Sequence, residues 1–322
     1  MKESYIDKVK RLMQDIDNKI CPGLNIWQKL GILIDFSYER VTRDVELIDY
    51  VQYGFYWKKR RERKRFMTHG ELLKIMRACN NPEHRSIFDN KPEFNRAFND
   101  YLGREWLDAS NSSYEEYIAF LYGKDKVFVK DPSGMFGKGI QCFDAKELAS
   151  KEKYDEIKHT LMEEALVQCE EFAEFNASST NTMRLVTLIT QEGDVKVMAG
   201  VLRIGRKGQV ADNFHHYGIA ALIDVETGIV KTTGVDRDFR RYVIHPDSGK
   251  PIVGFQVPEW DNVIATVKAA AKVIPDMRYI GWDVAINAKH EIVLIEGNPG
   301  ADPDICQIPD QVGKWNEFKK LI

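Results

Sequence analysis

Two stretches near the end of the chain decide the fold: Gly281-Trp282-Asp283-Val284-Ala285-Ile286-Asn287 and Ile292-Val293-Leu294-Ile295-Glu296-Gly297-Asn298. Both alternate as strands do, and the four residues between them are typical of a turn. If the chain folds back at Lys289-His290, Asp283 lies opposite Glu296, with their Cβ atoms about 5 Å apart. The sequence therefore predicts a β-hairpin that brings two acidic side chains together.

The same hairpin predicts a metal site. Glu296 and Asn298 are two residues apart, so their side chains point to one face of the strand. Carboxylates this close repel each other unless they share a proton or a cation. Oxygen donors without His or Cys suit Mg²⁺ or Mn²⁺, and Mg²⁺ usually completes its shell with water and phosphate oxygens. We predict that Asp283, Glu296 and Asn298 bind the metal; the alternative is a surface hairpin with solvated acidic residues.

The composition is that of a soluble globular protein. Of the 322 residues, 43% are hydrophobic and 30% are charged, and the net charge of -3 does not favour binding to nucleic acid. No apolar run approaches the roughly 18 residues of a membrane span, and Met1-Lys2-Glu3-Ser4 lacks the layout of a secretion signal. The five cysteines have no spacing typical of a zinc site or a disulfide framework. We therefore expect a cytoplasmic protein without a transmembrane segment.

Residues 1–85 are predicted to form a helical N-terminal region, because their apolar residues recur at helical spacing. The first helix is expected to carry Ile6, Val9, Met13, Ile16 and Ile20 on one face. This region contains a dense basic run, Lys58-Lys59-Arg60-Arg61-Glu62-Arg63-Lys64-Arg65. The run is either a solvated helix face or a surface that docks to an anionic polymer or a membrane.

A glycine loop, Asp131-Pro132-Ser133-Gly134-Met135-Phe136-Gly137-Lys138-Gly139, joins apolar strands predicted at 127–130 and 140–143. Its glycines let backbone N–H groups approach a ligand closely, and such loops cradle phosphate. Lys130 ends the strand before the loop. The loop is not a Walker loop, and in kinases the lysine strand follows the glycines instead. A plain flexible turn is the alternative, but the predicted Mg²⁺ site favours phosphate binding.

Strands dominate beyond residue 160, and turns at 191–194 and 226–228 are typical of hairpins. We therefore expect an α+β fold with mainly antiparallel sheets.

These motifs, in their order along the chain, resemble the ATP-grasp superfamily over roughly residues 86–305. The resemblance is carried by Asn90-Lys91, the 127–130 strand with its loop, Met162-Glu163-Glu164-Ala165-Leu166, Arg184, and Asp283 with Glu296-Gly297-Asn298. Residues 181–187 and 210–214 are most similar to the sugar-transfer-associated branch, which is related to α-L-glutamate ligases. The resemblance implies two α+β subdomains that clasp ATP: a small lid subdomain at 86–160 and a large subdomain with the metal site at 161–322.

The resemblance also implies the role of each site residue. Lys91 and Lys130 match the lysines that reach the ATP phosphates, and Ser133, Gly134, Gly137, Lys138 and Gly139 belong to the loop that covers them. Glu163, Glu164, Ala165 and Leu166 match the hinge that binds adenine, and either Glu170 or Glu171 holds the ribose. Asp283, Glu296 and Asn298 match the Mg²⁺ ligands. Arg184 and Arg203 match the arginines that steady the transferred phosphate, and with Lys130 they are the candidate catalytic residues.

The implied function is an ATP-dependent, ADP-forming carboxylate–amine ligase that works through an acylphosphate. Its substrates would be ATP and a small-molecule carboxylate and amine, in a cell-surface polysaccharide or amino-sugar pathway. The alternatives are an ATP-grasp phosphotransferase and a non-catalytic nucleotide-binding partner of a polysaccharide assembly enzyme. Many ATP-grasp ligases have an α/β domain where this chain is helical, so their substrate pocket does not transfer; residues 212–216, with two histidines, are candidates to line it here.

Overall fold

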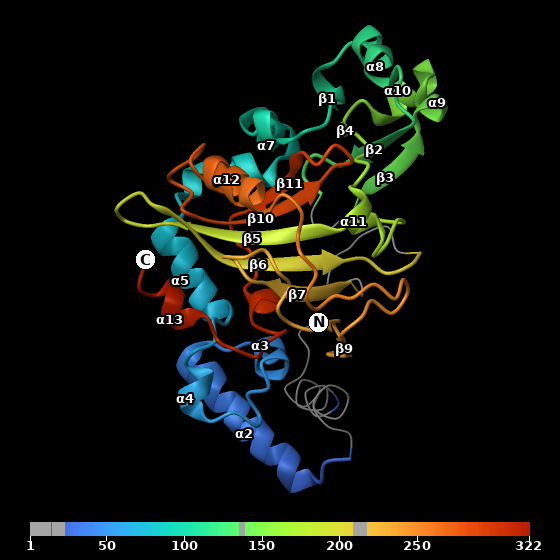
Figure 1. Cartoon of the computed structure of the whole chain (residues 1–322). Coiled ribbons are helices and arrows are strands. Elements are labelled where there is room, and N and C mark those ends of the chain that lie inside the picture. Colours follow the sequence, from blue (N-terminus) through green and yellow to red (C-terminus); the bar gives the residue numbers. More distant parts are fainter. Residues whose placement is uncertain (1–13, 15–22, 135–138, 209–217) are drawn as a thin grey trace. The chain divides into compact units, whose positions relative to one another are not determined.

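The computed structural model describes residue 14 and residues 23–134, 139–208 and 218–322 (Figure 1). The chain divides into two units, which we call the helical unit (Met1–Ile75 with Asp302–Lys320) and the two-sheet unit (Met76–Ala301 with Leu321–Ile322). Most of the predicted first helix and the candidate pocket residues 212–216 lie outside the described residues. No described helix is both long and apolar enough to cross a membrane.

The helical unit is built from short helices around an aromatic core. Its helices are α2 (Ile26–Arg43), α3 (Leu47–Gln52), α4 (Arg60–Arg63), the first part of α5 (His69–Cys79), and α13 (Trp315–Phe318). Asn25 starts α2 with a capping box, in which its side chain accepts from the N–H of Gln28 at 3.0 Å. Tyr50, Tyr53, Phe55 and Phe66 are fully buried and contact one another edge-on or tilted.

The C-terminal segment Asp302–Lys320 belongs to this helical unit, whereas the sequence assigned it to the large subdomain at 161–322. Gln307 accepts from the N–H of Met67 at 2.9 Å and donates to the carbonyl of the same residue at 2.9 Å. The N–H of Trp315 donates to the carbonyl of Arg65 at 2.8 Å. The predicted boundaries at 1–85 and 161–322 therefore differ from the structural division, because a returning C-terminal segment leaves no local sequence signal of its distant partner.

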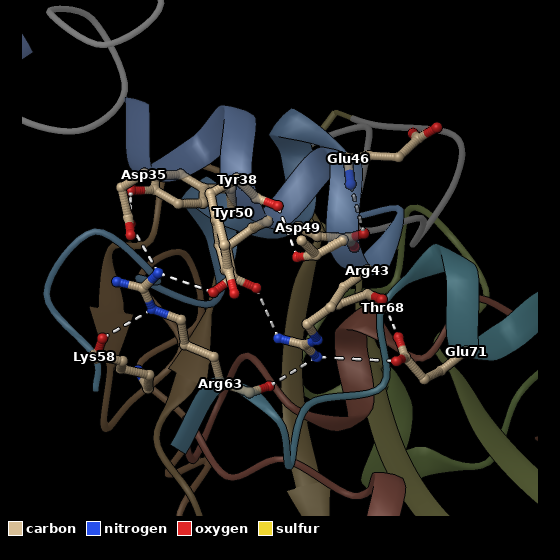
Figure 2. A network of polar contacts seen from close by, with 12 residues as sticks. Asp35, Tyr38, Arg43, Glu46, Asp49, Tyr50, Lys58, Arg63, Thr68 and Glu71 are labelled. Carbon is tan, nitrogen blue, oxygen red and sulfur yellow. Dashed lines mark hydrogen bonds and ion pairs between the residues drawn. The ribbon is translucent and has the colours of Figure 1, made fainter. Parts of the chain in front are cut away.

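Two members of the basic run lie inside this unit, so the run is not a single solvated face. Lys58 and Arg63 are buried, and Arg63 contacts Asp35 at 2.7 Å (Figure 2). Arg63 also contacts Glu39 at 3.1 Å. Arg43 also contacts Glu39, at 2.9 Å. The paired charges satisfy one another, as buried ions require.

The smaller sheet of the two-sheet unit has four strands in the order β1-β4-β2-β3. Its strands are β1 (Trp106–Asp108), β2 (Lys126–Lys130), β3 (Ile140–Asp144) and β4 (Leu161–Glu164). Three helices pack on it through a separate apolar core: α8 (Tyr114–Leu121), α9 (Ala145–Leu148) and α10 (Lys151–Ile157). β4 pairs with β1 and β2 and therefore belongs to this sheet, while the lid subdomain expected at 86–160 stays a prediction.

The larger sheet has seven strands in the order β11-β10-β5-β6-β7-β8-β9. Its strands are β5 (Thr182–Ile189), β6 (Val195–Ile204), β7 (Ile219–Ile223), β8 (Gly234–Val235), β9 (Arg241–Tyr242), β10 (Tyr279–Ile286) and β11 (Ile292–Asn298). The neighbouring strands in both sheets pair antiparallel, which confirms the predicted α+β class.

One face of the larger sheet is covered by helices, which leaves the polar side chains of β5, β6, β10 and β11 on the other. Helix α12 (Trp260–Ala271) lies across it (Figure 1), and Val263 and Val267 enter the main apolar core. Helices α6 (Arg85–Asp89) and α7 (Lys91–Ala97) bring Phe88 and Phe94 to the same core, and the short α11 (Glu170–Ala173) follows β4. Trp282 is fully buried there and donates to the Thr187 hydroxyl at 2.9 Å.

Candidate functional site

The β10–β11 hairpin places Asp283 directly opposite Glu296, as the sequence predicts. A register irregularity follows at once, between Asp283 and Val284. The amide of Asn298 donates to the Glu296 carboxylate at 3.0 Å, so the two side chains share one face. Asp283 is buried, whereas Glu296 is exposed. The three predicted metal ligands are therefore neighbours at the end of the hairpin.

Two arginines continue the line of charges across the sheet. Arg184 on β5 lies opposite Asp283, and its Nε and Nη2 contact the two carboxylate oxygens at 2.5 and 3.0 Å. Arg203 on β6 reaches the same carboxylate at 2.8 Å. Four neighbouring strands thus present two acidic and then two basic side chains, which we call the charge row: Glu296, Asp283, Arg184 and Arg203.

The electrostatics of the two carboxylates differ sharply. Burial disfavours ionisation of Asp283, but Arg184 and Arg203 outweigh it and hold the pKa of Asp283 well below its usual value. Glu296 is exposed as a residue, but local desolvation of its carboxylate, followed by the neighbouring charge of Asp283, raises its pKa. The pair therefore behaves as two like charges in contact, which a shared proton or a cation relieves.

A second cluster surrounds Glu163 on β4, which is buried. Its carboxylate contacts Lys130 at 2.5 Å, Arg104 at 2.9 Å and the amide of Asn95 at 3.0 Å. Burial alone would raise the pKa of Glu163, but the charges of Arg104 and Lys130 lower it to about 2. Sequence reasoning assigned Glu163 to adenine and Lys130 to phosphate; the structure shows that the two side chains are bound to each other.

Arg104 is a site residue that sequence reasoning missed. Besides Glu163, its guanidinium donates to the carbonyl of Leu294 on β11 at 2.7 Å and to that of Leu102 at 3.1 Å. It therefore ties the four-stranded sheet to the β10–β11 hairpin. The only local signal was a charged residue just before a short strand, next to a glycine, and nothing in that pattern indicates a partner about sixty residues away.

Lys91 opens helix α7, where Asn90 caps the helix by accepting from the N–H of Glu93 at 3.0 Å. The lysine also holds the start of the glycine loop: its Nζ donates to the carbonyls of Asp131, at 3.0 Å, and Gly134. Burial lowers the pKa of Lys91, and Glu296 opposes that effect. Lys91 therefore lies within electrostatic range of the charge row.

Part of the glycine loop is described. Ser133 donates its N–H to the Asp131 carboxylate at 2.9 Å, and Gly139 has a φ of +75°, which favours glycine. The carbonyl of Gly134 accepts from Lys91, and its N–H donates to the carbonyl of Asp131 at 3.2 Å. Gly137 and Lys138 lie outside the described residues.

The predicted hinge leaves β4 and runs toward the larger sheet. Glu164 accepts from the N–H of Glu105 at 3.3 Å, and the N–H of Ala165 donates to Lys126 at 3.1 Å. Leu166 is half-buried. Of the two ribose candidates, Glu171 lies 3.7 Å from His290, whereas Glu170 is exposed.

The donor set can hold a hard cation only through oxygen. Among the described residues, no group of three His, Cys, Asp or Glu side chains is placed to bind a metal. The predicted set contains two such side chains and the Asn298 amide, whose oxygen is a ligand that Mg²⁺ accepts. The repulsion between Asp283 and Glu296 fits a cation at this position.

The comparisons with known proteins define the class. The family model for sugar-transfer associated ATP-grasp proteins matches residues 82–321, and the chain belongs to this family. This confirms both the superfamily and the branch predicted from the sequence. No curated protein matches the chain.

Solved structures with a similar fold include three ATP-grasp or synthetase proteins. The ATP-grasp ligase PsnB in complex with its minimal precursor is 14% identical, with 81% of this chain and 69% of that chain covered and a TM-score of 0.47. The ADP complex of purK, an N5-carboxyaminoimidazole ribonucleotide synthetase, is 14% identical over 80% of this chain and 58% of that chain, with a TM-score of 0.47. D-alanyl-alanine synthetase A from Vibrio cholerae is 12% identical over 74% and 62%, with a TM-score of 0.44.

Proposed function

We propose that this protein is an ATP-dependent, ADP-forming ligase that joins a carboxylate to an amine through an acylphosphate. The observation that carries the proposal is the charge row, in which two acidic and two basic side chains lie side by side on one sheet face. Membership of the ATP-grasp family supports the use of ATP. Within that family setting, this row has the composition needed to hold both a metal and a phosphate group.

The basic side chains have donors to spare for phosphate. An arginine has five N–H donors and a lysine has three. Arg184 uses two of its donors on Asp283, and Lys130 uses one on Glu163. Asp283 and Glu163 thus orient these cations, and the remaining N–H groups are available to neutralise a transferring phosphate. In such sites fixed charges contribute more to the rate than any covalent role of the protein.

Asp283, Glu296 and Asn298 would hold Mg²⁺, which supplies charge neutralisation at the nucleotide phosphates. Lys91 and the N–H groups of the glycine loop would bind the same phosphates, and the hinge at Glu164, Ala165 and Leu166 would bind the adenine. The substrate carboxylate attacks the γ-phosphorus and the bond to ADP breaks. The amine then attacks the acyl carbon, phosphate leaves, and the amine loses a proton.

We further propose that the substrates belong to a cell-surface polysaccharide or amino-sugar pathway, because the family is described as associated with sugar transfer. The enzyme would join an amino acid, or another carboxylate, to an amine of such a precursor.

Hydroxylamine trapping tests the reaction. Amino acids and other carboxylates are screened for ADP release with ATP and Mg²⁺, and those that stimulate release are repeated with hydroxylamine. A ligase gives a hydroxamate, because hydroxylamine intercepts the acylphosphate. Arg184→Ala should depress the trapped product and the full reaction together, since it acts on the transferring phosphate. A stable phosphorylated product, without hydroxamate from any stimulating carboxylate, would replace the ligase with a phosphotransferase.

A further inference from the structure

Helix α2 presents a continuous apolar stripe to solvent. We call it the α2 stripe: Trp27, Leu30, Ile34, Tyr38 and Val41, which follow one another at spacings of three and four residues. Residues so spaced share one face of a helix. Trp27 is 78% exposed, Ile34 71% and Val41 85%. A contiguous apolar surface of this kind marks an interaction site more often than chance exposure.

The stripe is not the face that packs α2 into the helical unit, because the opposite face of the helix makes those contacts. Glu39 is buried there and Phe36 is half-buried, with the Phe36 ring 5.4 Å from that of Tyr50. The acidic groups of α2 also point inward: Asp35 accepts from Tyr50 at 2.7 Å and contacts Arg63 at 2.7 Å (Figure 2). The negative charges of Asp35 and Glu39 are therefore neutralised by internal cations.

Basic side chains adjoin the stripe. The exposed members of the basic run, which we call the basic rim, are Lys59, Arg60, Arg61, Lys64 and Arg65. Glu62 is the one acidic residue among them. The guanidinium of Arg60 lies 4.1 Å from the centre of the Tyr38 ring, so the rim and the stripe are in direct contact. Trp57, beside the rim, is 61% exposed.

We propose that the helical unit binds the surface of an anionic lipid bilayer through the α2 stripe and the basic rim. An amphipathic helix of this type lies in the plane of the membrane interface, with its apolar face among the acyl chains and headgroups. Trp and Tyr side chains favour that interface. Lys and Arg beside it are attracted to anionic headgroups, and the attraction ends within a Debye length.

Charge complementarity selects a lipid surface over two other occupants. In a two-fold contact between copies, the stripe of one copy would face the stripe of the other. Because Arg60 contacts Tyr38, the two basic rims would then lie close together and repel each other. The segment before Gly23 has a predicted apolar face, but its five basic and four acidic residues give it no excess of negative charge to complement the rim. An anionic bilayer satisfies both the stripe and the rim.

Vesicle sedimentation of the full chain tests the proposal. We expect the protein to sediment with phosphatidylcholine vesicles that contain phosphatidylglycerol, to bind pure phosphatidylcholine weakly, and to dissociate as NaCl is raised. The double variants Ile34→Asp/Val41→Asp and Arg61→Glu/Lys64→Glu should each lower the partition coefficient by at least about tenfold. These side chains are exposed, so both proteins should keep the wild-type ATP-dependent activity and thermal unfolding.

Matched controls lie on the two-sheet unit. Tyr122 is 88% exposed, and Tyr122→Asp adds an acid to an apolar surface site there. Lys268→Glu/Lys272→Glu reverses two exposed charges on or beside α12. Both control proteins should bind vesicles as the wild type does. Equal binding of stripe variants and controls, or binding that ignores phosphatidylglycerol, overturns the proposal. So does a wild-type dimer that Ile34→Asp/Val41→Asp converts to a monomer, because the stripe would then bind a second copy.

Discussion

Lys130 donates to the carboxylate of Glu163 across 2.5 Å, between the neighbouring strands β2 and β4. Lys130 pairs with Leu161, and Glu163 is two residues further along, so the contact is a diagonal cross-strand pair. Arg104 binds the same carboxylate at 2.9 Å. Glu163 therefore orients Lys130, and Arg104 is the second cation that neutralises the same carboxylate.

Because of this arrangement, Lys130→Met should lower activity without unfolding the protein. We expect activity to fall by roughly a hundredfold or more, as it does when comparable charge-stabilising donors are removed. The fold should persist, because Glu163 keeps Arg104 and Asn95 as partners. Steady-state kinetics with ATP and thermal unfolding measure the two effects. Lys126→Met, an exposed lysine at the start of the same strand, is the control and should leave both unchanged. Normal use of ATP by Lys130→Met would refute its assignment to phosphate.

The two hairpin carboxylates are expected to respond in opposite ways to neutralisation. Glu296→Gln removes a like charge beside Asp283, so the free energy of unfolding without Mg²⁺ should hold or rise. Asp283→Asn leaves Arg184 and Arg203 without their carboxylate, and removing one partner of a buried ion pair costs about 3–5 kcal/mol. Denaturant unfolding of both variants compares these values.

Both hairpin variants should lose Mg²⁺-dependent turnover, because each removes a proposed ligand. Near-normal turnover at saturating Mg²⁺ in either protein would contradict the metal assignment. The repulsion between the two carboxylates, taken alone, would make either substitution harmless to the fold. Arg184 and Arg203, which contact Asp283 and not Glu296, are the reason that Asp283→Asn is expected to destabilise it.

Patterns within a few dozen residues were enough to predict the hairpin, the fold class and the opposition of Asp283 and Glu296. The register next to the turn was not predicted: Val284 pairs with Leu294 and Ile286 with Ile292, one residue away from the pairing that a turn centred on Lys289-His290 gives, and the irregularity after Asp283 restores the expected pairing. Strand alternation also places Trp282 on the opposite face from Asp283, and it is buried in the core. Contacts between distant segments had no such signal. The hydrogen bonds of Gln307 with Met67 and of Arg104 with Leu294 form only when whole elements pack together, so no local pattern predicts them.

Arg104 is predicted to be a positioning residue that couples the two sheets. Arg104→Met should lower the free energy of unfolding of the two-sheet unit, by less than the about 3–5 kcal/mol of a fully broken pair because Glu163 keeps Lys130. In a double-mutant cycle with Glu163→Gln, we expect a coupling energy of about 0.5–3 kcal/mol. Arg85→Met, which removes an exposed pair with Asp89, should change stability by less than about 1 kcal/mol.

Additive effects of Arg104→Met and Glu163→Gln would show that the contact does not stabilise the unit. Hydrogen exchange provides a second measurement. Since Arg104 binds the carbonyl of Leu294, amides of β11 should exchange faster in Arg104→Met. Amides of β7, which β10, β5 and β6 separate from β11, should exchange as in the wild type.

Asp49 gives the helical unit a distinctive pH dependence. Burial raises the pKa of Asp49 from 3.8 to about 6, although the N–H of His69 donates to its carboxylate at 3.0 Å. Because the folded pKa exceeds the unfolded one, the folded unit binds more protons between these values. The contribution of Asp49 to stability is therefore complete below about pH 4 and is lost as the pH rises through 6, a change of about 3 kcal/mol.

Asp49→Asn should remove this dependence. One oxygen of Asp49 accepts from the N–H groups of both His69 and Glu46, at 3.0 and 3.4 Å, so the single amide oxygen of asparagine can replace it. Hydrogen exchange of the Tyr53 and Phe55 amides, corrected for the intrinsic effect of pH, measures opening of the helical unit. Relative to the variant, the wild type should lose protection between pH 4 and 7. Parallel profiles for the two proteins would show that Asp49 ionises normally in the folded unit.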